Sequence, residues 1–365
     1  MSDHLGKEQT MTRLPSPATL TILESSADPV RPVPDTRHLD FLGRMPIPLR
    51  RAFKAGLDRT VADHRAATGV NLDCSFLSGA EWYKPFDALA TANEEHLPGM
   101  LVTTFHHDIL APGLLARYAP GPSARQPNFH PACTAAGLPD PEGVFRLFAA
   151  IPFVFLVDEK RLKGRPAPRA WDDLLDPIWT DDIVFGGWRP NGQVPYQDYN
   201  SYLLLSLRRE YGDDGLAAFA VNVRHLQHNI RTATQAGSNS RDVGAIAILP
   251  WLQAELSPRR ERIRVVWPED GALTMPIGYL VKPEAETRLW QLADYVSGVE
   301  LGRTLVRNCY PPSNPAIPGA FPAGAKLKWP GWDYARTHDL ATESKRAADK
   351  FFTAWNEAHE VRECG

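Results

Sequence analysis

The sequence predicts an α/β protein of two lobes, and three observations lead to this fold class. The chain has 365 residues, which is long for one hydrophobic core and suits two. Apolar runs typical of buried strands alternate with stretches whose apolar residues recur at helical spacing, and this β–α–β order favours a parallel sheet with right-handed crossovers. Residues 168–187 combine both patterns, because a short helical turn is followed there by a strand.

Composition and charge narrow the class of protein. Hydrophobic residues make up 43% and charged residues 23%, which is ordinary for a soluble globular protein. The net charge of −3 gives no reason to expect nucleic acid or an acidic membrane surface as a partner. The four cysteines, Cys74, Cys133, Cys309 and Cys364, are far apart and form no Cys-x-x-Cys pair, which argues against a thiolate metal site. Free thiols are the simplest interpretation, and one or two disulfides stay open.

The N-terminal region is polar and interrupted by proline. Residues 1–17 are expected to be extended or disordered, and residues 1–20 lack the basic start and apolar run of a secretory signal. Residues 18–23 alternate β-branched and other residues, so they are predicted to form the first strand. The polar loop that follows contains Ser25, Ser26 and Asp28, whose side chains could hold a ligand or simply form a turn.

The next elements continue the β–α–β order. Leu49, Phe53, Leu57 and Val61 recur at helical spacing, and Gly69 is predicted to cap the end of this helix. Residues 70–76 are predicted to form the second strand.

A third strand is expected before His106, His107 and Asp108. These side chains then follow the carboxyl end of a parallel strand, where open sheets bind ligands. Imidazole and carboxylate together suit a first-row transition metal. Adjacent histidines on a strand point to opposite sides, so at most one is an easy ligand, and a hydrogen-bonded structural histidine is the alternative.

A continuous apolar run at 151–158 is typical of a buried strand, and it precedes the segment 168–187. Trp171, Leu174 and Leu175 lie at i, i+3 and i+4, which predicts one amphipathic turn. Pro177 ends that turn, and residues 183–185 form a brief apolar strand closed by two glycines.

Two later segments carry further candidate ligand residues. Asn200 or Ser201 is a credible helix cap before Tyr202, and the free N–H groups of a helix start attract anions. Residues 236–251 run from a polar loop into a small-residue apolar strand that ends at Trp251. Near the C-terminus, an amphipathic helix is predicted to pack on the body of the protein; its apolar residues are Ala348, Phe351, Phe352 and Trp355.

Several segments together resemble one family. Five segments are similar to solute-binding proteins of ABC transporters. They are Trp171-Asp172-Asp173-Leu174-Leu175-Asp176-Pro177 with Trp179, the run 236–251, the return strand 265–272 with Pro-x-x-Gly at 268–271, the turn 297–302 and the proline-rich loop 310–315. A further strand of the first lobe is expected at 274–282. The iron- and polyamine-binding branches of the type II periplasmic-binding fold are nearest. The resemblance implies two α/β lobes around a ligand cleft, with hinge closure on the ligand.

The resemblance also implies a domain organisation and partners. Residues 18–108 and 268–340 would form lobe 1, residues 109–267 lobe 2, and residues 341–365 a C-terminal helix and tail. The family delivers a small ligand to the permease of an ABC importer, without a cofactor or nucleic acid, and a monomer is expected. A periplasmic location is implied, although no signal peptide is visible in the sequence, so a cytoplasmic one stays open.

The resemblance implies a ligand-binding set drawn from both lobes and leaves the ligand open between a metal or its chelate, an oxyanion and a small organic cation. The set is Ser25, Ser26, Asp28, His107, Asp108, Trp188, Asn200, Ser201, Tyr202, Ser238, Asn239, Trp251 and Tyr310. His106, His107 and Tyr310 would serve a metal, although the adjacent tyrosine pair of ferric-binding relatives is absent.

No phosphate loop, nucleophile elbow or His-Glu-x-x-His motif is present, and no catalytic residue is assigned. A cytosolic enzyme on the same fold, similar to those making a thiamin pyrimidine precursor, and a cytosolic ligand sensor are the alternatives.

Overall fold

The computed structural model describes residues 36–77, 86, 89–104, 109–120, 128–186 and 198–363, with the backbone alone at 198–200 and 361–363. The ten strands of this part form one sheet in the order β2-β1-β3-β9-β4-β7-β5-β6, with β10 beside β9 and β8 beside β4. The strands are β1 (Phe41–Arg44), β2 (Cys74–Leu77), β3 (Met100–Thr104), β4 (Arg146–Asp158), β5 (Ile183–Gly186), β6 (Val223–Gln227), β7 (Ile246–Pro250), β8 (Ile263–Val266), β9 (Ala272–Val281) and β10 (Leu327–Lys328).

Helices cover both faces of this sheet, and single 3-10 turns connect several of them. The α-helices are α1 (Arg50–Thr68), α3 (Pro112–Ala116), α4 (Pro131–Ala135), α5 (Asp198–Asn222), α6 (Asn229–Gln235), α7 (Trp251–Glu255), α8 (Glu286–Ser297), α9 (Val299–Arg307), α10 (Trp332–Thr337) and α11 (Leu340–Glu363). The 3-10 helices are Ile47–Leu49, Leu89–Thr91, Glu94–His96, Asp172–Leu175, Pro177–Trp179 and Pro283–Ala285. In the described ranges no helix is both long enough and apolar enough to cross a membrane.

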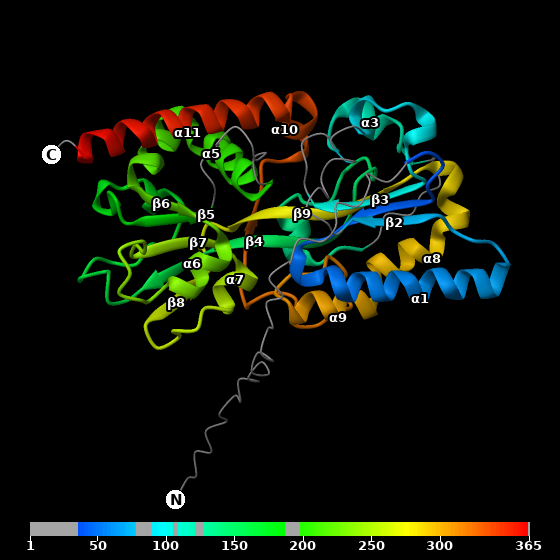
Figure 1. Ribbon diagram of the computed structural model, residues 1–365, viewed down its shortest axis with the longest axis horizontal. Coiled ribbons are helices and arrows are strands. Elements are labelled where there is room, and N and C mark those ends of the chain that lie inside the picture. Colours follow the sequence, from blue (N-terminus) through cyan, green and yellow to red (C-terminus); the bar gives the residue numbers. More distant parts are fainter. Residues whose placement is uncertain are drawn as a thin grey trace, which may run out of the picture.

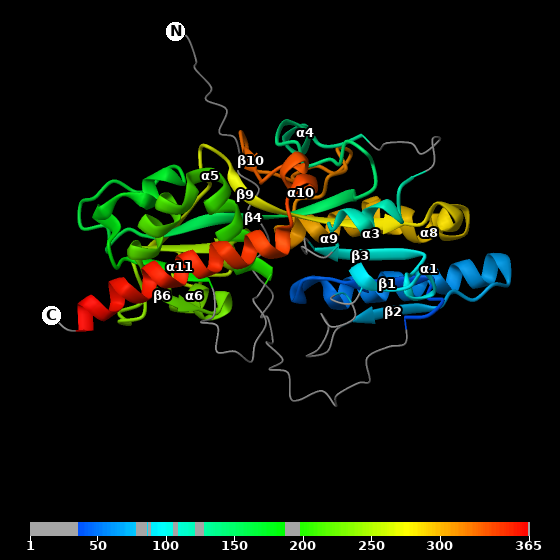
Figure 2. The ribbon, with the colours of Figure 1, turned by 90° about the horizontal axis from the view of Figure 1, so that it is seen from above.

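The sheet extends through two lobes that share their central strands. Figure 1 shows lobe 1, with β1 to β3 and helices α1, α3, α8 and α9, on the right, and lobe 2, with β5 to β8 and helices α5, α6 and α7, on the left. The long strands β4 and β9 run from one lobe into the other, as the view from above also shows (Figure 2). The predicted α/β, two-lobed fold class is therefore confirmed, whereas the exact domain boundaries stay a prediction.

The first helix forms where the apolar spacing predicts it. Phe53 and Leu57 of α1 are buried, and Phe53 stacks on Phe76 of β2 with ring centroids 5.3 Å apart. Gly69 ends the helix with a φ of 73°, a left-handed conformation that glycine adopts without steric cost, and its N–H donates to the Arg65 carbonyl.

The central tryptophan segment anchors lobe 2. Residues 172–175 form a 3-10 turn, tighter than the expected α-helical turn, and Trp171 before it is fully buried. The Trp171 indole N–H donates to the Gly271 carbonyl at 3.0 Å, and the ring meets Phe155 edge-on with centroids 4.9 Å apart. Asp176 then accepts from the Ile178 N–H and caps the next 3-10 turn.

One predicted strand lies outside the described residues, and the expected crossing into lobe 1 differs from the structure. The predicted first strand at 18–23 lies outside the described residues, and β1 at Phe41–Arg44 pairs in parallel with both β2 and β3. The return into lobe 1 was expected at 265–272, followed by a separate strand at 274–282. Instead β9 alone makes the crossing, because Thr274 pairs with Pro152 of β4 while Leu280 pairs with Leu101 of β3.

The C-terminal helix lies on lobe 2, beside α5 (Figure 2). Phe351 of α11 packs on Phe185 and Phe219, with ring centroids 5.9 and 6.0 Å away. The Trp355 indole N–H donates to the Val223 carbonyl at 2.9 Å. The amphipathic face predicted from the sequence is thus buried against the body of the protein.

Close packing at Gly244 gives a testable consequence. A Cβ at this position would lie 2.1 Å from the Asp182 carbonyl oxygen, and that backbone is fixed by bonds from Asp182 N to the Trp179 and Asn222 carbonyls. We expect Gly244→Ala to lose about 1–3 kcal/mol of unfolding free energy, measured by urea denaturation. Gly113, inside α3 with open space around it, is the matched control, and Gly113→Ala should be neutral or stabilising by about 0.5–1 kcal/mol. Equal losses in both variants would contradict the packing argument.

Candidate ligand-binding site

The carboxyl ends of the parallel strands in the two lobes face each other along β4. Thr104 at the end of β3 pairs with Ile277 of β9, which pairs with Ala149 of β4. Pro250 at the end of β7 pairs with Phe153, four residue steps further along β4, or about 13 Å. Open α/β sheets bind ligands at such carboxyl ends. We call this region the interlobe site; it comprises the ends of β1 and β3 in lobe 1 and of β5, β6 and β7 in lobe 2.

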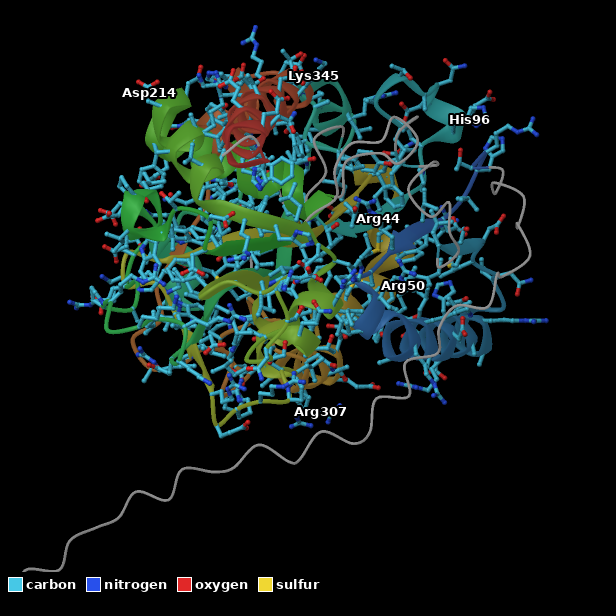
Figure 3. All side chains as sticks on the ribbon, turned by 60° about the vertical axis from the view of Figure 1, so that its left-hand side comes forward. Arg44, Arg50, His96, Asp214, Arg307 and Lys345 are labelled. Atoms are coloured by element: carbon cyan, nitrogen blue, oxygen red, sulfur yellow. The ribbon has the colours of Figure 1, made fainter. Side chains whose placement is uncertain are left out.

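Lobe 1 places a buried cation at this edge. Arg44 is the last residue of β1 and only 1% exposed. Its Nε donates to the Thr103 hydroxyl at 2.7 Å, and its guanidinium lies 4.8 Å from the centre of the Phe86 ring. The Thr103 hydroxyl in turn donates to the Thr104 carbonyl, so the end of β3 holds the arginine in place. Arg44 and Arg50 are labelled in Figure 3, on the β1 and α1 side of the molecule.

The start of α1 adds positive potential to the same edge. The helix follows β1 after a short proline-containing turn, and its N-cap, Leu49, supplies no side-chain hydrogen bond. No acidic residue lies in the first turn, whereas Arg50 begins the helix and its Nε donates to the Met45 carbonyl at 3.1 Å. The N-terminus of a helix carries about half a positive charge, so this edge favours an anion.

Lobe 2 presents histidine, asparagine and tryptophan at the opposing edge. His228 follows β6 and caps α6, because its Nδ1 accepts from the Ile230 N–H at 3.2 Å. Burial lowers the pKa of His228, so its imidazole is neutral at pH 7. The Asn229 side-chain oxygen occupies the space that a Cβ of Gly186 would need, at the end of β5. Trp251 follows β7 directly, and its indole N–H donates to Glu255 at 3.0 Å.

Two predicted tyrosines lie beside the crossing strands rather than at the strand ends. Tyr202 is fully buried, and its hydroxyl donates to the Thr274 carbonyl of β9. Tyr310 is 1% exposed and immediately precedes Pro311, whose carbonyl accepts from the Ala150 N–H of β4. These positions tie α5 and the segment after α9 to the strands that join the lobes. Ser201, beside Tyr202, is also buried.

The predicted pair Ser238 and Asn239 lies at the other end of lobe 2. Helix α6 begins at the interlobe site and carries the chain away from it, so these residues precede the amino end of β7. Arg161, which follows the far end of β4, donates to the Ser238 carbonyl. The structure therefore does not bring this pair together with Trp251, which is half-buried at the interlobe site.

The remaining predicted residues lie outside the part of the chain that the structure describes. They are Ser25, Ser26, Asp28, His106, His107, Asp108 and Trp188, together with the side chain of Asn200. Among the described residues no group of three or more histidine, cysteine or carboxylate side chains could hold a metal ion. The predicted metal set of His106, His107 and Tyr310 stays a prediction.

Three residues of the interlobe site were not predicted from the sequence: Arg44, His228 and Asn229. Arg44 lies in a region interpreted as a proline-rich connection, because the first strand was placed at 18–23. The available signal was Phe41-Leu42-Gly43 ahead of a charged residue and a helix, which is the pattern of a short strand ending at a ligand edge. In lobe 2, His228 lies between β6 and α6, and Asn229 begins α6.

A family model described as "Bacterial extracellular solute-binding protein" matches residues 100–338, well over half of the chain. The protein belongs to this family. A search of curated proteins found no match. As a member of a solute-binding family, the protein is grouped with binding proteins of the kind that serve ABC importers rather than with enzymes.

Solved structures of solute-binding proteins share the fold over nearly their whole length. A Bordetella ferric binding protein is 15% identical, with a TM-score of 0.59, covering 86% of this chain and 98% of that one. Trichodesmium IdiA (FutA), in complex with iron and citrate, is 14% identical with a TM-score of 0.56, covering 87% and 98%. AfuA from Actinobacillus pleuropneumoniae, with exogenous fructose-6-phosphate bound, is 13% identical with a TM-score of 0.56, covering 86% and 98%. At these identities the likeness shows the fold alone.

The cysteines of this solute-binding protein give a pH-dependent prediction. Cys74, Cys133 and Cys309 are free, and burial raises the pKa of each thiol to about 12; at Cys74 the nearby carboxylate of Asp40 adds to this effect. A raised pKa keeps the thiol protonated, so in a Cys364→Ser background we expect slow reaction with Ellman's reagent at pH 8. The rate should rise about tenfold per pH unit through pH ~10, because only the thiolate reacts. A rate that levels off near pH 9 in the native protein would contradict this.

Proposed function

We propose that the protein captures a small anionic solute, one that carries carboxylate or phosphate groups, between its two lobes and delivers it to an ABC importer. The observation that carries this proposal is Arg44, a cation held at the carboxyl end of β1, with 1% of its side chain exposed. A guanidinium is always charged and its planar fork matches carboxylate and phosphate oxygens.

The rest of the edge supports the same ligand chemistry. The first turn of α1 contains no acidic residue, and Arg50 and Arg51 add positive charge to the positive end of the helix dipole. From lobe 2, the neutral His228 and Asn229 provide polar groups without adding negative charge. Citrate and fructose-6-phosphate, named for two of the similar structures, are multiply charged anions, which agrees with this class of cargo.

Capture would use the strands that join the lobes as a hinge. The segment after α9 forms a third connection there, because Ala150 N donates to the Pro311 carbonyl and Ser313 N to the Phe148 carbonyl. A ligand that contacts Arg44 on one side and the α6 start on the other stabilises the closed arrangement by its extra contacts. The protein is then a carrier in the periplasm that performs no chemical step on its cargo.

Thermal unfolding against a ligand panel tests the proposal. The panel contains phosphate, fructose-6-phosphate, citrate, ferric citrate, ferric ion with a non-binding buffer, spermidine and amino acids. A ligand that binds the folded state alone stabilises it by about 2.7 kcal/mol at ~100 times its dissociation constant. We expect an anion to raise the melting temperature. Stabilisation by spermidine or by free ferric ion, with no effect of any anion, would contradict the proposal.

A further inference from the structure

A groove on the helical face of lobe 1 is independent of the interlobe site. It lies between α1 and α8, which run side by side below the lobe 1 sheet in Figure 1, and the turn from α8 into α9 closes one end. The hollow has a volume of about 340 Å³. Tyr295 anchors its wall, since its hydroxyl donates to the Phe53 carbonyl and its ring fills the space beside Gly56.

Large apolar side chains are exposed in this groove. Trp290 is 57% exposed and Val299 42%, and both line the groove. Trp290 is the one exposed aromatic residue among the large hydrophobic side chains of the described chain. Contact with a partner removes the apolar surface of an exposed tryptophan from water. Tryptophan is also among the residues that dominate the binding energy of protein interfaces.

The charge of the groove is negative. Asp63 and Asp294 line it together with Glu300, and Asp294 lies one helical turn after Trp290 on the same face of α8. Glu300 pairs with Arg59 across α9 and α1, whereas within the described residues no cationic side chain pairs with Asp63 or Asp294. Two carboxylates beside an indole face form the complement of an arginine or lysine side chain.

We propose that this groove docks a basic, extended segment of a partner protein, with an arginine between Asp63 and Asp294 and its aliphatic stem or an apolar neighbour on Trp290. Side chains of both α1 and α8 line the hollow, so a linear segment that follows the two helices can contact both. Protein surface is favoured over a free small cation because the carboxylates and Trp290 are exposed, and a larger partner excludes water from them on docking.

The test uses a fluorescein-labelled peptide, Gly-Leu-Arg-Gly-Arg-Leu-Gly, and measures its binding to the full chain by fluorescence anisotropy. We expect saturable binding with a dissociation constant of about 10–100 μM in low salt, weakening as salt is added. Trp290→Ala and the pair Asp63→Asn/Asp294→Asn should each weaken it about tenfold or more. The peptide with citrulline in place of arginine should not bind.

Matched controls keep the result specific. Asp214→Asn/Asp333→Asn removes two exposed carboxylates elsewhere and should leave peptide binding unchanged. Binding of the anion panel should be the same in all these variants, because the groove and the interlobe site are separate. No binding at about 1 mM peptide in low salt would overturn the proposal. Equal binding by agmatine, a free guanidinium compound, would also overturn it and assign the groove to a small cation.

Discussion

Replacing Arg44 with methionine is expected to abolish capture of the anionic solute, lowering its affinity at least ~100-fold, or by about 2.7 kcal/mol. The guanidinium is the buried charge at the carboxyl end of β1, and methionine keeps the apolar stem while removing the charge and the fork of donors. Isothermal titration calorimetry with the stabilising anion of the thermal panel measures the loss.

Two further variants separate charge from geometry at this position. Arg44→Lys keeps the charge but loses the planar fork, so its affinity should be intermediate. Arg51→Gln removes an exposed cation from the same edge, and we expect a change of less than ~3-fold, since an exposed charge is screened by salt. Circular dichroism of each variant must match that of the unmodified protein. Unchanged affinity in a correctly folded Arg44→Met variant would refute the assigned role.

Replacing Trp171 with alanine is expected to cost about 3–5 kcal/mol of unfolding free energy, the largest stability effect we anticipate for one side chain. The ring is fully buried, contacts Phe155 edge-on and donates to the Gly271 carbonyl just before β9. The change therefore leaves a cavity and also an unpaired carbonyl at the point where the chain leaves lobe 2. Urea denaturation followed by fluorescence or circular dichroism gives the value.

Conservative and exposed tryptophan variants provide the comparison. Trp171→Phe retains an aromatic ring but loses the donated hydrogen bond, so we expect a loss of about 1–3 kcal/mol. Trp290→Ala changes an exposed ring and should stay within about 0.5 kcal/mol of the unmodified protein. If Trp171→Ala and Trp290→Ala have equal stability, the anchoring role of Trp171 is wrong.

The sequence predicted correctly those helices and turns that are determined by residues close together in the chain. The spacing of Phe53 and Leu57 and the capping glycine at 69 defined α1, since apolar periodicity and a left-handed end both act within a few residues. The Trp171 segment was located correctly for the same reason, whereas its hydrogen bond to Gly271, which lies 100 residues further along the chain, was not predicted. A contact between residues so far apart in the chain cannot be predicted from the pattern of neighbouring residues.

The candidate site was less predictable because it depends on the direction in which each element runs. Ser238 and Asn239 have polar side chains in a loop before a strand, but α6 takes that loop to the far end of lobe 2. Arg44 was missed because Phe41–Arg44 is only four residues long and its apolar run ends in a charge. The parallel pairing of β1 with both β2 and β3 identifies it as a strand, and this pairing is a property of the folded sheet.

The path of the chain has a consequence for biosynthesis. Lobe 1 lacks β9 until residues 272–281 have been made, and lobe 2 lacks the cover of α11 over α5 until residues 340–363 have been made. Lobe 1 therefore cannot complete its sheet until β5 to β8 of lobe 2 have been translated, and neither lobe can be severed and expressed alone without cutting through β4 and β9. Most of the chain is therefore synthesised before either core is complete.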